Sequence, residues 1–148
     1  MAGESIPEKL IQAAETDLDC YERLLVISAR EFSSISGEDM EELPNILDAK
    51  EVVIQEIHAN SEVCAPFWLE IDNWQGDETL LDQLGDAVQK VREAVLMVQQ
   101  GEMRLAALVA TRSREVREAI GVISKSGKAL DAYKPIMTYS PRFVDRNE

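Results

Sequence analysis

The sequence predicts an all-α protein, in which an elongated antiparallel helical hairpin is followed by one long C-terminal helix. Apolar residues recur at alternating spacings of three and four, the heptad pattern of a coiled-coil-like three-helix bundle. A glycine separates the first two periodic stretches, and no proline interrupts the third. Because 148 residues are enough for one domain, we expect a single helical domain over residues 1–148.

The first helix is expected over residues 6–36. Pro7 suits a helix start, because its missing N–H is not needed in the first turn. Gly37 suits the helix end. The predicted seam of this helix alternates in spacing between three and four and consists of Ile11, Ala14, Leu18, Tyr21, Leu25, Ser28, Phe32 and Ile35.

The second helix is expected over residues 39–60. Asp39 can accept hydrogen bonds from the first-turn amides, and Glu42 follows three residues later, as in a capping box. The short joint around Gly37 predicts that the first two helices form an antiparallel hairpin. The predicted seam of the second helix consists of Met40, Leu43, Leu47, Lys50, Ile54 and Ile57.

Residues 61–78 interrupt the pattern and are expected to form a loop with a short helical turn. Pro66 and Gly76 punctuate this stretch, and it contains both tryptophans, Trp68 and Trp74. We favour a cap that closes one end of the bundle, because large aromatic side chains are usually mostly buried. An exposed binding patch is the alternative.

The third helix is expected over residues 79–132, followed by a flexible tail over 135–148. Such a helix would be on the order of 80 Å long, more than the two shorter helices can cover from one side. The part beyond Thr111 should therefore overhang the hairpin. Its apolar side would then be covered by a binding partner, which could be a second copy of the chain or another protein.

Charge and composition exclude several classes of function. The chain has 15 basic and 28 acidic residues, a net charge of −13, which argues against binding nucleic acid. It has no apolar run of about 18 residues, so we expect no membrane insertion. The first residues lack the features of a signal peptide. Cys20 and Cys64 are too few for a disulfide scaffold and are interpreted as reduced thiols of a cytoplasmic protein.

The sequence offers no constellation for catalysis. His58 is the single histidine, and Gln55 stands where a di-iron helix motif needs a glutamate. One histidine and two distant cysteines do not readily make a zinc site. We expect no enzymatic activity, no catalytic residues, no cofactor and no metal; an enzyme would need a metal that the motifs do not reveal.

One face of the last helical stretch is the candidate partner-binding surface. Cations flank it, at Arg112, Arg114, Arg117, Lys125 and Lys128. An apolar stripe rimmed by cations can bind another helix, although the same face could instead pack on the first two helices. The predicted partner face consists of Val116, Ile120, Ile123, Leu130 and Tyr133.

Two stretches carry a resemblance to a known family. In "LLVISAREFSSISGEDMEELPNILDAKEVVIQEI", Glu31 precedes a second helix that Asp39 begins and that has Lys50 at its centre. In "LDAYKPIMTYSPRFVDRNE", a tyrosine ends the last helix before a short basic and acidic terminus. With its size, acidity and helical layout, the chain resembles the FlgN family of flagellar type III export chaperones over nearly its full length.

This resemblance implies a cytoplasmic chaperone that keeps hook–filament junction proteins unassembled and delivers them to the export gate. The family's C-terminal helix is taken to bind the terminal helical segment of the substrate, which here corresponds to Val116, Ile120, Ile123 and Leu130. Tyr133 is the nearest match to the tyrosine implicated in contacting the export gate, and Tyr139 is the alternative. Other hypotheses are a filament-cap chaperone, a coiled-coil adaptor and a self-assembling homodimer.

Overall fold

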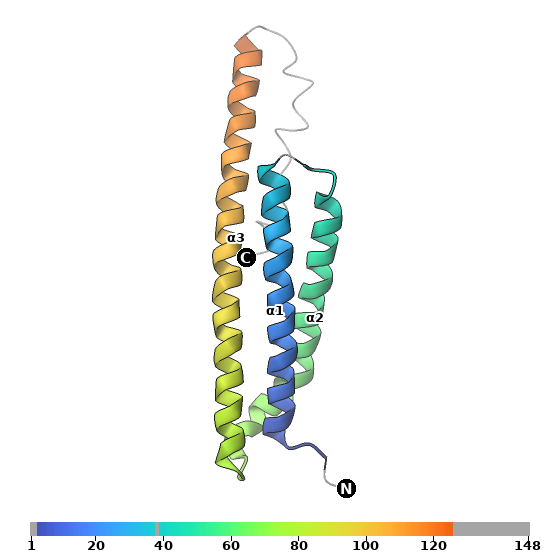
Figure 1. Ribbon diagram of the computed structural model, residues 1–148, viewed down its shortest axis with the longest axis vertical. Helices are drawn as coiled ribbons and strands as arrows, with labels where there is room; N and C mark the ends of the chain where they lie inside the picture. The colour runs from blue at the N-terminus through green and yellow to red at the C-terminus, as the bar shows by residue number, and fades with distance from the viewer. Residues whose placement is uncertain (1–2, 38, 126–148) are drawn as a thin grey trace. The chain divides into compact units, whose positions relative to one another are not determined.

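The computed structural model describes residues 3–37 and 39–125. Three α-helices follow one another along the chain: α1 (Ile6–Ser36), α2 (Leu43–Glu70) and α3 (Glu78–Lys125) (Figure 1). A short 3-10 turn, η1 (Ile71–Asn73), lies between α2 and α3. The described residues contain no strand, which confirms the all-α prediction. In these same ranges, no helix has the length and apolar character needed to span a bilayer.

The chain divides into two compact units, Met1–Glu102 and Met103–Glu148. The first unit contains α1, α2, η1 and the part of α3 that ends at Glu102. The second unit is described over α3 residues 103–125. The predicted third helix extended to residue 132, and its last seven positions, together with the predicted tail over 135–148, lie outside the described residues.

Helix α1 has the bounds that the sequence predicts. The Ser5 side chain caps its first turn by accepting a hydrogen bond from the Glu8 amide, with Pro7 in the position where a missing N–H costs nothing. At the other end, the Gly37 amide donates to the Ser33 carbonyl over 2.9 Å. Figure 1 shows α2 running antiparallel to α1, as the short joint predicts.

Helix α2 differs from the prediction at both ends. It begins at Leu43 rather than at residue 39, because the Ser34 hydroxyl donates to the Asp39 carbonyl and holds this residue in the connection. It also continues to Glu70, so the loop predicted over residues 61–78 was wrong for its first ten positions. Pro66 lies inside the helix on its exposed side. Proline has no N–H to donate to the backbone carbonyl one turn earlier, but on this side water can donate to that carbonyl instead.

Packing explains why α2 persists through Pro66. Cys64 is buried in a cluster with Leu10 of α1 and Leu84 of α3, and Phe67 packs against this cluster. These contacts come from residues more than fifty positions before and about twenty positions after Cys64. Burial of apolar area therefore outweighs the local cost of the proline, which no pattern within residues 61–78 could indicate.

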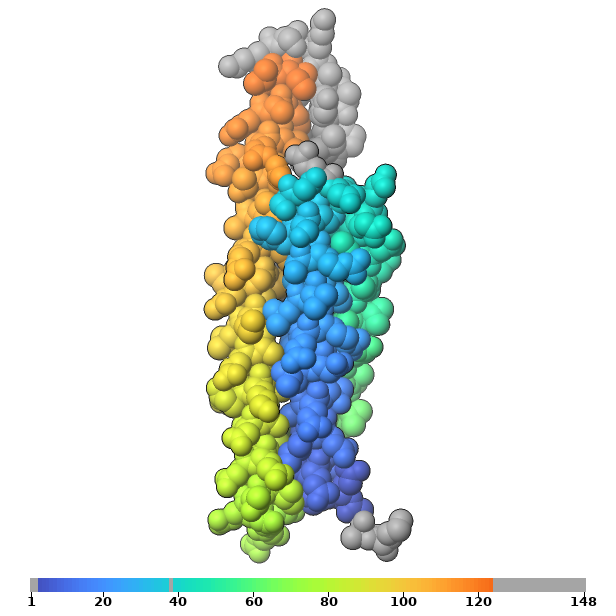
Figure 2. Space-filling view, in the orientation of Figure 1, coloured from blue at the N-terminus to red at the C-terminus, as the bar shows by residue number. Residues whose placement is uncertain are grey.

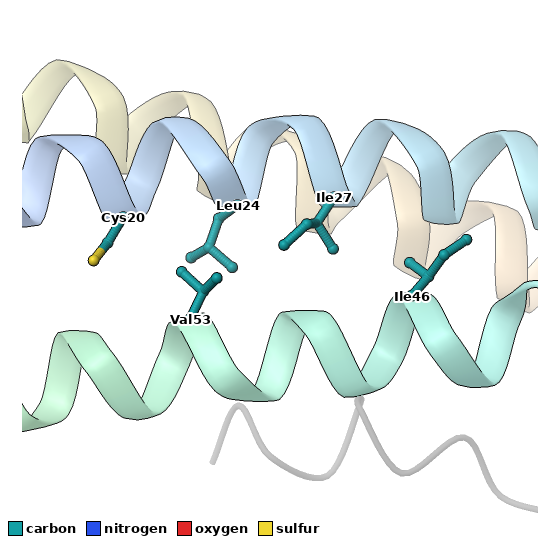
Figure 3. Packing of buried hydrophobic residues seen from close by; sticks show 5 residues of the cluster. All are labelled: Cys20, Leu24, Ile27, Ile46 and Val53. Carbon is teal, nitrogen blue, oxygen red and sulfur yellow. The ribbon is translucent and has the colours of Figure 1, made fainter.

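A second apolar cluster holds the hairpin together nearer its closed end. Cys20, Leu24 and Ile27 of α1 point toward α2, and Ile46 and Val53 of α2 point back at them (Figure 3). Val98 of α3 packs against the same cluster. In the space-filling view, the side chains of α1 meet those of α3 within the first unit (Figure 2).

The two tryptophans lie around the turn that joins α2 to α3. Trp68 is partly exposed on α2, whereas Trp74, after η1, is half-buried. A Cβ at position 76 would come within 2.5 Å of the Trp74 ring, so the ring occupies the space that a side chain would need there. A residue with a Cβ at position 76 would therefore force the Trp74 ring to move.

Candidate functional site

The predicted partner face lies in the second unit. Val116, Ile120 and Ile123 follow one another at spacings of four and three, which places them on one side of α3. Val116 is 42% exposed, Ile120 is 5% exposed and Ile123 is half-buried. Of these three residues, Val116 is therefore the one whose side chain is most exposed. Three further residues named from the sequence lie outside the described residues, namely Leu130, Tyr133 and Tyr139.

The apolar stripe on this side of α3 begins before Val116. Leu105 is buried and Val109 is half-buried at earlier positions of the same stripe. Arg112 was predicted to flank the apolar stripe, but it falls seven residues after Leu105 and so occupies a position of the stripe itself. Its guanidinium lies 3.0 Å from the Glu115 carboxylate. A charged group thus stands within the apolar stripe.

Charge changes sign within α3. Residues 78–102 contain two basic and five acidic side chains, whereas residues 103–125 contain five basic and two acidic ones. Arg104, Arg114 and Arg117 are exposed in the second unit. The exposed valine at position 116 therefore lies on a positively charged stretch of helix. Such a surface favours a partner whose apolar residues are bordered by carboxylates.

A cluster of charged side chains, which was not predicted from the sequence, lies inside the first unit. Lys50 of α2 lies between two carboxylates, with its Nζ 2.9 Å from Oε1 of Glu31 on α1 and 2.7 Å from Oε1 of Glu102 on α3. The Ser28 hydroxyl donates to the same Glu102 oxygen over 3.1 Å. We call Glu31, Lys50 and Glu102 the polar layer, because each of three helices contributes one charged residue to it.

Glu31 is the most deeply buried member of the polar layer. Its side chain is 0% exposed, and its Oε2 has no hydrogen-bond partner among the described residues. Burial raises the pKa of the Glu31 carboxyl, the ammonium of Lys50 opposes this shift, and the nearby Glu102 adds to it. The layer thus holds two carboxylates against one cation, and the more buried carboxylate is the one whose charged form is disfavoured.

The raised pKa of Glu31 predicts how its contribution to stability depends on pH. Between the ordinary pKa and the raised one, the folded chain holds a proton that the unfolded chain has released. The contribution of Glu31 is therefore present at acid pH and lost as pH rises through the folded pKa. We expect the free energy of unfolding of the unmodified chain to fall, relative to Glu31→Gln, as pH rises from the ordinary glutamate pKa of about 4.3 through the raised pKa of Glu31.

Urea unfolding followed by circular dichroism at several pH values measures this difference. Glu56→Gln is the control of opposite sign, because the Arg23 guanidinium lowers the pKa of the Glu56 carboxyl. The contribution of Glu56 is lost as pH falls, and it should be small because Glu56 is exposed. If the difference in unfolding free energy between the unmodified chain and Glu31→Gln did not change with pH, the raised pKa of Glu31 would be contradicted.

Cys20, Asn60 and His58 lie in three different environments within the first unit. Burial raises the pKa of the Cys20 thiol, despite the Arg23 guanidinium 3.4 Å away, so this sulfur stays protonated and is a poor nucleophile. The Asn60 amide donates to the Ala13 carbonyl and to Asp17, at 2.9 and 2.7 Å. His58 is exposed. No group of three metal-ligating side chains that could hold an ion occurs within residues 3–37 and 39–125.

Comparisons with known proteins give no match for this chain, whether with protein-family models, with curated proteins or with solved structures.

Proposed function

We propose that this protein is a non-enzymatic chaperone that binds a helical segment of a larger protein through the second part of α3. The observation that carries the proposal is the partly exposed apolar stripe of residues 105–123, on a helix of 48 residues. Helices α1 and α2 have 31 and 28 residues. An amphipathic segment of a partner would cover the stripe and so complete a helix–helix contact.

We further propose that the partner is a flagellar hook–filament junction protein, delivered to the export gate as in FlgN-type chaperones. The support is the resemblance in the two quoted stretches and the all-α hairpin followed by a long helix. Terminal segments of such cargo would be disordered when alone and would become helical when bound. The positive charge of residues 103–125 would favour acidic groups beside the cargo's apolar residues.

Val116→Asp tests the assignment of the surface. A carboxylate at this position would be placed in an apolar contact, and we expect the affinity for the terminal helical segments of junction proteins to fall about 10- to 100-fold. Isothermal titration calorimetry with those segments measures the change. Ala107→Asp is the matched control, because it adds the same charge at an exposed position on the opposite side of α3, about two and a half turns before Val116.

Circular dichroism of both variants checks that α3 is retained. Undiminished binding by Val116→Asp, or an equal loss in Ala107→Asp, would remove the surface from the proposal. If none of the junction segments binds the unmodified chain, the assignment of the cargo is wrong.

Self-association is the second candidate function, and the charge distribution favours it. Residues 1–102 carry 6 basic and 23 acidic side chains, whereas residues 103–148 carry 9 basic and 5 acidic ones. The basic stretch of one copy could therefore attract the acidic surface of another. Light scattering on the isolated protein distinguishes the two: a dimer that Val116→Asp dissociates supports the adaptor, and a monomer supports the chaperone.

A further inference from the structure

The polar layer occupies positions that the heptad pattern reserves for apolar side chains. On α1, buried residues recur at spacings of four and three, at Cys20, Leu24, Ile27, Glu31 and Ser34. Helix α2 buries Ile46, Lys50 and Val53 at the same spacings. The seam of α3 within the first unit continues the pattern with Leu84, Val88, Val91, Val95, Val98 and Glu102, all at least partly buried.

The apolar part of the α3 seam is nearly uniform. Apart from Leu84, every apolar seam position up to Val98 is a valine. A slide of α3 by one heptad, about 10 Å along its axis, would place valine or leucine at all four of these valine positions in one direction and at three of the four in the other. Apolar contacts alone do not distinguish these arrangements by much, because burial energy depends on area and not on identity.

The polar layer does distinguish them. After a slide of one heptad, Val95 or Val109 would take the place of Glu102. The 2.7 Å contact between Lys50 and Glu102 would be lost, and so would the hydrogen bond from Ser28. A slide that keeps Glu102 inside the bundle would also place its carboxylate among apolar side chains, away from a cation, at a cost of several kcal/mol.

We propose that the polar layer of Glu31, Lys50 and Glu102 sets the register of α3 against the α1–α2 hairpin. Single polar residues at core positions fix register and partner in coiled coils, at some cost in stability. Here the function is divided among three helices: Glu31 and Lys50 make a pair within the hairpin, and Glu102 brings α3 to that pair. The inference is independent of the proposed chaperone function.

Distance measurements between spin labels on exposed Glu15 of α1 and exposed Gln100 of α3 test the proposal. These positions are well separated along the helices, so that a slide of α3 changes their distance by nearly its full length. Cys20→Ala and Cys64→Ala provide a background without native thiols, and dilution with unlabelled protein limits the signal to one chain. The unmodified layer is expected to give one distance.

Replacing the whole layer by leucine, as Glu31→Leu with Lys50→Leu and Glu102→Leu, should leave the chain folded but add a population shifted by about 10 Å. Glu102→Leu alone keeps the neutral pair of Glu31 and Lys50 within the hairpin and should show the same shifted population. This variant tests the proposal even if the triple variant fails to fold. The charge-inverted layer, Glu31→Lys with Lys50→Glu and Glu102→Lys, should return a single distance. One unshifted distance in Glu102→Leu and in any folded triple variant, or several distances in the charge-inverted layer, would overturn the proposal.

Discussion

Lys50→Met is expected to lower the free energy of unfolding by about 3–5 kcal/mol at neutral pH, the largest effect of any substitution considered for this protein. The methionine would fill much of the space of the lysine stem. It would leave Glu31, which is fully buried, and Glu102 without their shared cation. Two carboxylates would then face each other in the bundle with little water, which is a costly arrangement. Urea unfolding followed by circular dichroism measures the loss.

Acidification should rescue this variant in part. Lys50 opposes the rise in the pKa of Glu31, so removing it raises that pKa further. A group with a raised pKa contributes stability at acid pH that is lost at higher pH. We therefore expect the deficit of Lys50→Met to be smaller at about pH 4 than at about pH 7.

Lys90→Met is the matched control, because it removes the same charge from an exposed position of α3. Its effect should stay within about 0.5 kcal/mol at both pH values. Equal losses in the two lysine variants, or a deficit of Lys50→Met that grows on acidification, would show that Lys50 does not neutralise a buried charge.

Leu10→Ala is expected to cost about 2–5 kcal/mol of unfolding free energy, the second largest effect. Leu10 is 0% exposed and lies in the cluster with Cys64 of α2 and Leu84 of α3, with Phe67 packed against it. Shortening this side chain removes apolar contacts with two other helices at once and leaves a cavity where the end of α2 is held. Thermal and urea unfolding both report the change.

Leu69→Ala makes the same chemical change one residue before the end of α2, where the side chain is 82% exposed. It should change the free energy of unfolding by no more than about 0.5 kcal/mol. Similar losses in the two leucine variants would mean that Leu69 has a contact in solution that the first unit alone does not explain.

Local sequence signals were sufficient for the fold class and for one helix in full. Heptad spacing, a proline in the first turn and a glycine after the last turn predict residues 6–36 as a helix, and α1 has these bounds. These signals act within a few residues, through backbone sterics and hydrogen bonds of the first and last turns. The same signals at residues 61–78 were misleading, because Pro66 is a local cost that a distant contact outweighs.

The face that a helix buries was harder to predict. The expected seam of α1 put Phe32 inside, yet Phe32 is 39% exposed and its neighbour Glu31 is buried. On α2, the predicted seam correctly contained Lys50 but began with Met40, which lies before the helix and is exposed. Hydrophobicity ranks a glutamate as a surface residue, so the rotation of α1 about its axis was off by about one position.

For the candidate partner face, the sequence likewise predicted the side of the helix but not the burial of each residue. Spacing alone placed Val116, Ile120 and Ile123 on one side of a helix, and this holds wherever α3 is helical. Only the tertiary structure decided that Ile120 is buried while Val116 is exposed. The sequence by itself therefore determined which residues share a helix and a side. The burial of each of these residues depended on the tertiary structure. The burial of Glu31 likewise depended on groups that other helices contribute, because burying a charge without a partner that neutralises it is costly.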